Sequence, residues 1–561
     1  MYSIIKKHSN IIYFTIFALI WLFLFWKCRY GFGFSDEAYY LCRPLRILKG
    51  DNYLINEWDL SQLSSILLLP AMKLHMVLFG STTGIILHFR YLFTFIWGLS
   101  ALYIYFMLKT ISRTGAVISS IVYLIYTPFG IMALCYNSMG IMFLTLSLVT
   151  FVSKYSEKPL MLCLSGVFFA CSVLCSPLLL SIYILYSIKS AYHAIRKSNP
   201  DFVNNWKYTS LGAVIVFIIF CFIVITPITD RIELLKNTIP NMFIDPTHMN
   251  MSFIYKMYLF IHSIFFSNAV SPYVLSFVLI ICLLCKFTNL NKRILFTLVC
   301  IALIIYQICF LITRPYLNFM MFAPGILSIF CLIKSDNRTI HSLFYYVQIP
   351  GIIYSICINL SSDQLFYAIS SASTVSAIAG FMIITLYIKD MVSSSSKTKA
   401  EKIVLYFAIV FILLQTFSEA YLRYTGIFWE RSIKEQTEKI EVGAEKGLLV
   451  TQQKYNDYNA LYYDTEVLRE SNEYDTVLIF SDHLALYLDT DKNIGSYSPW
   501  TTTPDQITLT KLILYYRTLP DKLPDVIYAT NTSEELTYFT SLGYKEGQSD
   551  LGIYMLIKDP N

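Results

Sequence analysis

The segment from Gly31 to Asp51 reads GFGFSDEAYYLCRPLRILKGD and follows an apolar run from Ile11 to Trp26. Within it Leu41, Leu45 and Leu48 fall on one face of a helix, whereas the basic side chains lie off that face. This spacing predicts a short amphipathic helix that lies on a membrane surface, just beyond the end of a first membrane-spanning helix. The remaining expectations about the fold depend on placing this segment outside the membrane.

The composition is that of an integral membrane protein. The chain has 561 residues, of which 56% are hydrophobic and only 14% charged, and its mean hydropathy is +0.55. Soluble domains carry about 25% charged residues. The net charge of +6 comes from short Lys/Arg clusters between apolar runs, which indicates membrane topology rather than a surface for nucleic acid. The 13 cysteines are scattered, mostly inside apolar runs, and no CxxC or Cys/His pairing suggests a metal site, so we interpret them as packing residues.

The apolar runs have the length of bilayer-spanning helices, about 20 residues each. They predict about 13 transmembrane helices, near residues 11–26, 87–108, 114–129, 137–153, 160–175, 177–189, 208–228, 270–286, 294–313, 316–333, 341–359, 365–388 and 402–418.

The apolar run at 63–79 is ambiguous, because it contains Pro70, Lys73 and His75. When this run is left out of the count, the basic short loops all face the side of the N-terminus. Counting it as a span would reverse that pattern at every later loop. We therefore predict a juxtamembrane helix on the outer interface.

This topology predicts a multi-pass protein of the cell (inner or cytoplasmic) membrane with a cytoplasmic N-terminus. The loops at 27–86 and 229–269 and everything after about residue 419 are then outside. Beyond 419 charges become frequent, and residues 476–480, 526–529 and 552–557 read as strands, with helices near 508–517 and 533–542. The predicted fold class is a polytopic α-helical membrane domain over 1–419, followed by a small extracytoplasmic α/β domain over 420–561.

An acidic pair, Asp36 and Glu37, stands at the start of the predicted amphipathic helix. The helix dipole favours anions at this position, so simple capping explains the pair. A general base held at the membrane surface, which deprotonates a hydroxyl or amine, explains it equally well. The residues alone leave both interpretations open.

The region from Asp36 to about Lys109 resembles the start of a GT-C glycosyltransferase. The resemblance is closest to the polyprenyl-phosphate-sugar-dependent group, which includes aminoarabinose transferases and protein O-mannosyltransferases. The residues that carry it are, in order, Asp36-Glu37, Tyr39 or Tyr40, Arg43-Pro44, Gly50-Asp51, Leu78-Phe79-Gly80 and Arg90, and later Arg314-Pro315-Tyr316-Leu317. The chain departs from relatives where Glu57-Trp58-Asp59 stands without a Lys-Pro, and where Cys175-Ser176-Pro177 replaces Lys-Gly-Pro.

The resemblance implies inverting transfer of a sugar from a polyprenyl-phosphate donor to a lipid, glycan or protein acceptor on the outer face of the membrane. Asp36 is then the general base, and Glu37 orients it or shares its role. Arg90 and Arg314 are candidate ligands for the leaving phosphate, although interfacial anchoring explains both arginines too. Further candidate substrate contacts are Tyr39, Tyr40, Tyr316 and Asn137, and for Asn137 the alternative is a helix cap.

No cofactor is expected with certainty. A divalent metal is possible in this class, but the sequence offers no dedicated ligand set, and Asp489-Thr490-Asp491 reads as a turn. A lipid-linked glycan flippase or other transporter would favour charged residues in mid-span, and the predicted spans have almost none. A polysaccharide polymerase or ligase is the other alternative. The acidic pair directly after the first helix favours the glycosyltransferase.

Overall fold

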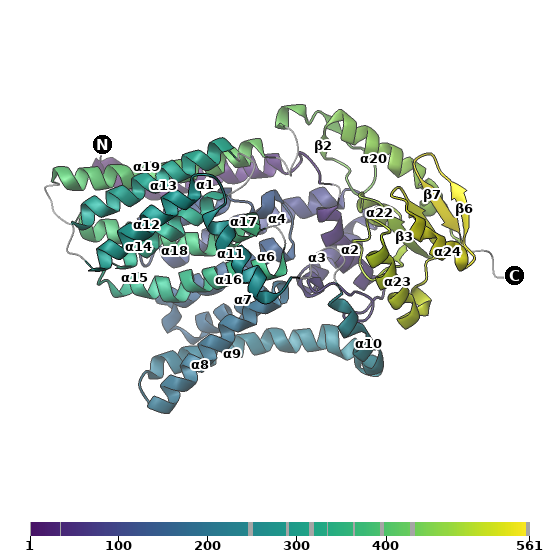
Figure 1. The fold of residues 1–561 in the computed structure, drawn as a ribbon, viewed down its shortest axis with the longest axis horizontal. Helices are drawn as coiled ribbons and strands as arrows, with labels where there is room; N and C mark the ends of the chain where they lie inside the picture. Colours follow the sequence, from purple (N-terminus) through teal and green to yellow (C-terminus); the bar gives the residue numbers. More distant parts are fainter. Residues whose placement is uncertain are drawn as a thin grey trace.

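The computed structural model describes residues 2–33, 35–244, 251–287, 291–313, 319–333, 335–362, 365–392, 398–426 and 432–556. A bundle of long helices forms one end of the molecule, and an α/β domain forms the other (Figure 1). The N-terminus lies at the far end of the bundle, and the C-terminus lies beyond the α/β domain.

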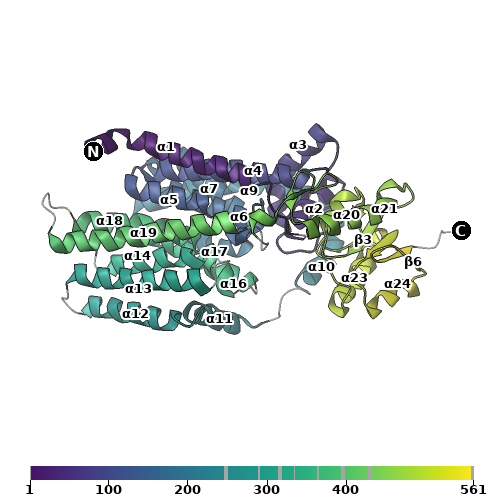
Figure 2. The same cartoon turned by 90° about the horizontal axis from the view of Figure 1, so that it is seen from above.

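The bundle confirms the predicted fold class. Eight described segments are long and apolar enough to cross a membrane, and shorter apolar helices lie beside them (Figure 2). In chain order the bundle contains α1 (Tyr2–Lys27), α4 (Ile85–Leu108), α5 (Arg113–Ile125), α6 (Tyr136–Val152), α7 (Pro159–Cys175), α8 (Leu180–Arg196), α9 (Pro200–Phe220), α12 (Ser271–Phe287), α13 (Lys292–Thr313), α14 (Ala323–Ile333), the run of α15 (Arg338–Leu343), η8 (Phe344–Gln348) and α16 (Ile349–Ser361), α17 (Leu365–Ala372), α18 (Thr374–Met391) and α19 (Lys399–Thr425).

The ambiguous run at 63–79 forms η1 (Gln62–Leu67) and α3 (Leu69–Phe79). An α-helix rises about 1.5 Å per residue, so α3 is roughly 16 Å long, about half the thickness of a bilayer core. Leu74, Val77 and Leu78 expose more than half of their surface. A short helix with exposed apolar side chains agrees with the interfacial placement predicted from the charges.

The helix of the Gly31–Asp51 segment is α2 (Asp36–Leu48), but its surroundings differ from the prediction. Every residue from Glu37 to Arg46 is buried, including both arginines. The helix therefore does not lie on the membrane with a charged face in water. Its charged face is covered by carboxylates of the same outer loop and by the C-terminal domain.

The described part of segment 229–269 contains two helices that the sequence did not predict, α10 (Ile232–Met242) and α11 (Phe253–Phe265). Met242 joins Ile228 in a hydrophobic cluster with residues of the C-terminal domain. This burial explains why the polar sequence around α10 is helical.

The C-terminal domain has a five-stranded sheet in the order β4-β3-β5-β7-β6. Its strands are β3 (Thr476–Phe480), β4 (Asn493–Ile494), β5 (Val526–Ala529), β6 (Lys545–Gln548) and β7 (Ile553–Leu556). The central strand β3 is parallel to β4 and β5, whereas β7 is antiparallel to β5 and β6. Strands buried on both faces read as apolar runs, which is why β3 and β5 were recognisable in the sequence.

Two membrane helices, α7 and α9, approach so closely that only glycine fits between them. A Cβ atom on Gly166 would lie 1.9 Å from the carbonyl oxygen of Thr209, and one on Gly212 would lie 1.9 Å from that of Cys163. Small residues at helix crossings let backbones pack closely, which is a main source of helix association in lipid.

We expect Gly166→Ala to destabilise the protein by about 1–3 kcal/mol, because the methyl group forces the two helices apart. The measurement is the thermal unfolding midpoint of the purified protein in detergent. The matched control is Gly325→Ala on α14, where the nearest atom to an added Cβ is Ser376 Cβ at an ordinary 3.7 Å. Equal midpoints for the two variants would contradict the assigned role of the α7–α9 crossing.

Candidate active site

The loop 27–86 and the C-terminal domain are joined by hydrogen bonds to main-chain carbonyls. Gly31 N donates to Leu449 O at 2.7 Å, and Trp58 N donates to Tyr497 O at 2.8 Å. Thr82 Oγ1 donates to Leu488 O at 2.7 Å. The candidate residues of the loop therefore lie at the boundary between the helix bundle and the α/β domain.

A buried ionic network holds α2 in this boundary. Arg46 binds Asp51 at 2.7 Å and Glu57 at 2.6 Å, and Arg43 binds Asp59 at 2.8 Å. Lys522 of the C-terminal domain contacts Asp51 at 2.6 Å. Three cations thus face three carboxylates, and the two arginines are only 1% and 2% exposed.

The three carboxylates of the network differ in their electrostatics, because burial raises the pKa of Glu57 to about 8 in spite of Arg46 and Arg43. Burial opposes ionisation of Asp51, but Arg46 and Lys522 outweigh it and hold the pKa of that carboxyl below its usual range. Burial likewise opposes ionisation of Asp59. The charge of Arg43 and the hydrogen bonds of Asp59 outweigh burial and hold the pKa of that carboxyl below its usual range. The Glu57-Trp58-Asp59 departure from the family pattern therefore supplies partners for α2.

Glu37 is fully committed to Arg90. The two side chains form a bidentate pair, with Arg90 Nε 2.7 Å from Oε1 and Nη2 2.5 Å from Oε2 of Glu37. Arg90 also donates to the carbonyls of Cys28 at 2.8 Å and Tyr30 at 3.1 Å. Glu37 is 2% exposed and Arg90 is 1% exposed. The pair fastens the start of α2 to α4 and to the end of α1.

Asp36 is the neighbour of Glu37 in sequence but not in environment. It is half-buried, and within the described residues it accepts no hydrogen bond and forms no ion pair. The predicted alternative of helix capping finds no side-chain hydrogen bond to support it, since among the described residues the side chains of Asp36 and Ser35 accept from no helix N–H. Burial, and then the charge of Glu37, raises the pKa of Asp36 to about 6. Such a carboxylate is ionised at neutral pH and is more basic than usual.

Of the aromatic candidates, Tyr39 belongs to the ionic network, whereas Tyr40 lies near Asp36. Tyr39 donates to Asp59 at 2.8 Å, and the guanidinium of Arg43 lies 4.0 Å from the centre of its ring. Tyr40 packs edge-on against Tyr136, with ring centroids 5.8 Å apart. Tyr40 and Tyr136 are also within electrostatic reach of Asp36, so they line its surroundings.

Asn137 does not cap α6. The helix begins at Tyr136, and its cap is Cys135, which forms a reciprocal capping box with Ser138. The capping explanation for Asn137 is therefore wrong, because the residue lies inside the first turn. It stays a candidate contact, 9% exposed and one residue beyond Tyr136.

Arg423 is not among the candidate residues predicted from the sequence. Its helix, α19, was expected to end at 418, before the polar residues, but it continues to Thr425. Arg423 is 8% exposed, and its Nε has no hydrogen-bond partner. No carboxylate of the described residues pairs with it, and it lies within electrostatic reach of Arg90. What identifies Arg423 is that its guanidinium is buried and no carboxylate of the described residues pairs with it. Burial and pairing are visible only in the folded protein, so the sequence could not identify this residue.

A second basic side chain lies beside Arg423. Lys27, at the end of α1, donates to the main-chain carbonyls of Arg423, Tyr424 (3.2 Å) and Gly426 (2.6 Å). These carbonyls are the negative end of the α19 dipole. The ends of α1, α4 and α19 on the side of the C-terminal domain thus gather Lys27, Arg90 and Arg423, and Glu37 is paired with one of the three.

Other candidates lie elsewhere. Arg314 and Tyr316 fall outside the described residues. Asp489 accepts hydrogen bonds from Ala444 N and Tyr458, whereas Asp491 pairs with Lys49 at 2.6 Å, so these carboxylates serve different partners. Over the described part of the chain, no group of three or more His, Cys, Asp or Glu side chains could hold a metal ion.

The two adjacent carboxylates should respond oppositely to neutralisation. We expect Glu37→Gln to cost about 3–5 kcal/mol, because it leaves the charge of Arg90 buried without its partner. Asp36→Asn should leave the thermal midpoint at pH 7 unchanged or higher, because burial disfavours the ionised form of Asp36. Thermal unfolding of both variants in detergent measures this, and a large loss of stability in Asp36→Asn would contradict it.

Comparison with known proteins supports the fold rather than a close kinship. No protein-family model matches the chain, and no curated protein sequence matches it. The apo crystal structure of the oligosaccharyltransferase of Archaeoglobus fulgidus is similar with a TM-score of 0.50 and 10% identity, over 99% of this chain and 75% of that one. The structure of oligosaccharyltransferase AglB from Archaeoglobus fulgidus, in complex with an inhibitory peptide and a dolichol-phosphate, gives 0.49 and 11% over the same shares. The chain is therefore a multi-helix membrane protein with the GT-C fold.

Proposed function

We propose that the protein is a membrane glycosyltransferase that transfers a sugar from a polyprenyl-phosphate donor to an acceptor on the side of the C-terminal domain. The observation that supports this most is Asp36, a half-buried carboxylate without a partner among the described residues. It lies where the helix bundle of a GT-C fold meets the α/β domain. Unpaired groups with a perturbed pKa are found preferentially at catalytic sites.

In the proposed reaction Asp36 accepts the proton of the acceptor hydroxyl or amine. The freed electron pair forms the new bond to the anomeric carbon, and the bond from that carbon to the phosphate oxygen breaks on the opposite face. The product is inverted at the anomeric carbon, and polyprenyl phosphate leaves with the bonding electrons. A raised pKa suits this role, because proton transfer is most effective from a base whose pKa approaches the working pH.

Glu37 has a positioning role in this proposal. Its bidentate pair with Arg90 fixes the first turn of α2, and hence the main chain that carries Asp36. Arg90 is then not a free phosphate ligand, because both ends of its guanidinium are already engaged.

The leaving phosphate needs cations, and Arg423 is the residue that we propose in place of Arg90. It is buried near the outer end of α19, and Lys27 lies beside it. A guanidinium binds phosphate through two hydrogen bonds, and a preorganised cation in a dry site stabilises developing charge strongly. Arg314 stays a candidate for the same role.

We expect Asp36→Asn to lower the transfer rate by about 10²–10⁴-fold at pH 7.5. In wild type the rate should fall about tenfold per pH unit below pH 6, because Asp36 must be ionised and its pKa is about 6. The assay follows the release of polyprenyl phosphate in membranes from a deletion strain that expresses each variant at equal level.

Glycan and lipid profiles of the same strains name the sugar and the acceptor, since the missing product identifies both. Full restoration of that product by Asp36→Asn would refute the base assignment. The flippase and polymerase alternatives would then become the better explanations.

We expect Arg423→Gln to lower the transfer rate by about 10²–10³-fold while its thermal midpoint stays equal to or above wild type. Removing an unpaired buried charge relieves a desolvation cost, whereas a structural arginine would lower the midpoint. The matched control is Arg293→Gln at the opposite end of the bundle, where Arg293 pairs with Glu401 at 2.7 Å. A normal rate in Arg423→Gln would exclude Arg423 as the phosphate ligand.

A further inference from the structure

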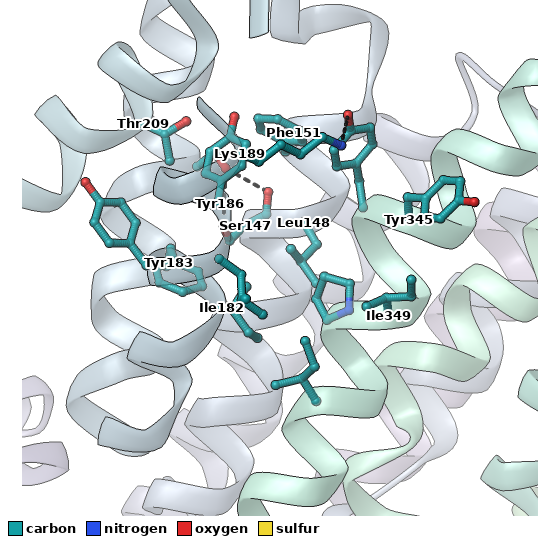
Figure 3. Close-up of a pocket in the computed structure, with 16 residues that line it drawn as sticks. Ser147, Leu148, Phe151, Ile182, Tyr183, Tyr186, Lys189, Thr209, Tyr345 and Ile349 are labelled. Carbon is teal, nitrogen blue, oxygen red and sulfur yellow. Dashed lines mark hydrogen bonds between the residues drawn. The ribbon is translucent and has the colours of Figure 1, made fainter. Parts of the chain in front are cut away.

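A cavity of about 200 Å³ lies among the membrane helices, away from the candidate active site (Figure 3). Its walls come from α6, α7, α8, α9, η8 and α16. Most of the wall is apolar, with Leu148, Ile182 and Ile353 among the lining side chains. Leu185 on α8 and Tyr345 on η8 line it and are more than half exposed, so the cavity opens toward the lipid.

The cavity lies in the half of the bundle that is remote from the C-terminal domain. Ser147 lines it, and at about 1.5 Å per residue this position is roughly 16 Å along α6 from Tyr136, the neighbour of Asp36. In Figure 1 the turn of the α8–α9 hairpin, which forms one wall, lies below the bundle on the left, the side on which the N-terminus also lies. In the predicted topology this end is the cytoplasmic leaflet.

One cation reaches the cavity. Lys189 lines it, and its Nζ lies 5.0 Å from the ring centroid of Phe202 and 5.1 Å from that of Tyr346. Its one hydrogen bond, to Tyr346 OH, is long at 3.4 Å. Within the described residues no carboxylate pairs with this ammonium. The mouth of the cavity therefore has a positive charge held between aromatic faces.

The cavity wall also has an unsatisfied polar atom. The hydroxyl of Tyr186 is buried and has no hydrogen-bond partner, although its ring is fixed edge-on against Phe151 and Phe202. A buried hydroxyl without a partner costs free energy in an apolar setting, so it indicates a ligand that accepts or donates there. Tyr186 and Lys189 lie three residues apart on α8, which puts them on neighbouring positions of one face.

We propose that this cavity binds one anionic phospholipid of the leaflet, with its headgroup phosphate at Lys189 and Tyr186 and an acyl chain against the apolar wall. Basic pockets between transmembrane helices on the cytoplasmic side are suited to acidic lipid headgroups. A soluble anion would gain nothing from the apolar wall, and a neutral lipid would leave the ammonium without a counter-charge. The site does not depend on the proposed glycosyl transfer, because it lies at the other end of the bundle.

Native mass spectrometry of the full chain tests the site, with phosphatidylglycerol and phosphatidylcholine titrated separately. We expect wild type to bind one phosphatidylglycerol about fivefold more tightly than Lys189→Ala does, since one basic residue near the headgroups contributes about that factor. Lys207→Ala, an exposed lysine at the same end of the bundle, should bind as wild type. Phosphatidylcholine should not distinguish the three proteins.

A second pair of variants tests the acyl-chain part. Leu185→Trp should block the cavity and remove the bound lipid. Ile184→Trp should not, because Ile184, the preceding residue, is half exposed as well but does not line the cavity. Both positions are on the surface of α8, so both variants should fold. Equal retention of phosphatidylglycerol by Lys189→Ala and Lys207→Ala would overturn the proposal. So would a Lys189-dependent site that takes polyprenyl phosphate and not phosphatidylglycerol.

Discussion

The buried charges of Arg43 and Arg46 are the constraint on which the rest of the outer half depends. Taking a guanidinium out of water costs several kcal/mol, and only a complete set of partners offsets that cost. The partners come from two parts of the chain. Asp51, Glu57 and Asp59 belong to the outer loop, whereas Lys522 and the carbonyl of Ser496 belong to the C-terminal domain. Loop and domain therefore reach a low energy only when they are assembled together.

This assembly explains how two adjacent carboxylates acquire different properties. Once α2 is fixed between loop and domain, Glu37 faces Arg90 and is neutralised by it. Asp36, one residue earlier, lies near Tyr40 and the start of α6, and no cation of the described residues pairs with it. A raised pKa on an unpaired carboxylate is found preferentially at catalytic sites.

The sequence was sufficient for most of the elements, although it did not predict α10 and α11, and it was insufficient for their partners. Apolar runs placed the bundle helices and the strands β3, β5 and β7, and loop charges placed α3. The burial of α2 could not be predicted, because a helix with leucines on one face and arginines off it looks the same whether water or carboxylates cover the arginines. Arg423 was missed for the same reason. A charge at the end of an apolar run reads as the edge of the membrane, and the helix that continues past it becomes visible only in the fold.

Glu419 and Arg423 are four residues apart on α19, a spacing at which an acid and a base ordinarily pair along a helix. They are not paired in the structure. Glu419 instead accepts from Gln415 at 3.1 Å, while Arg423 lies toward Arg90 and Lys27. An internal pair would neutralise the guanidinium and leave the outer end of the bundle without an available cation. Because Gln415 binds the acid, Arg423 stays available at that end, and at the other end no carboxylate of the described residues pairs with Lys189. The two proposed roles, sugar transfer from a polyprenyl phosphate and binding of an anionic phospholipid, each need such an available cation.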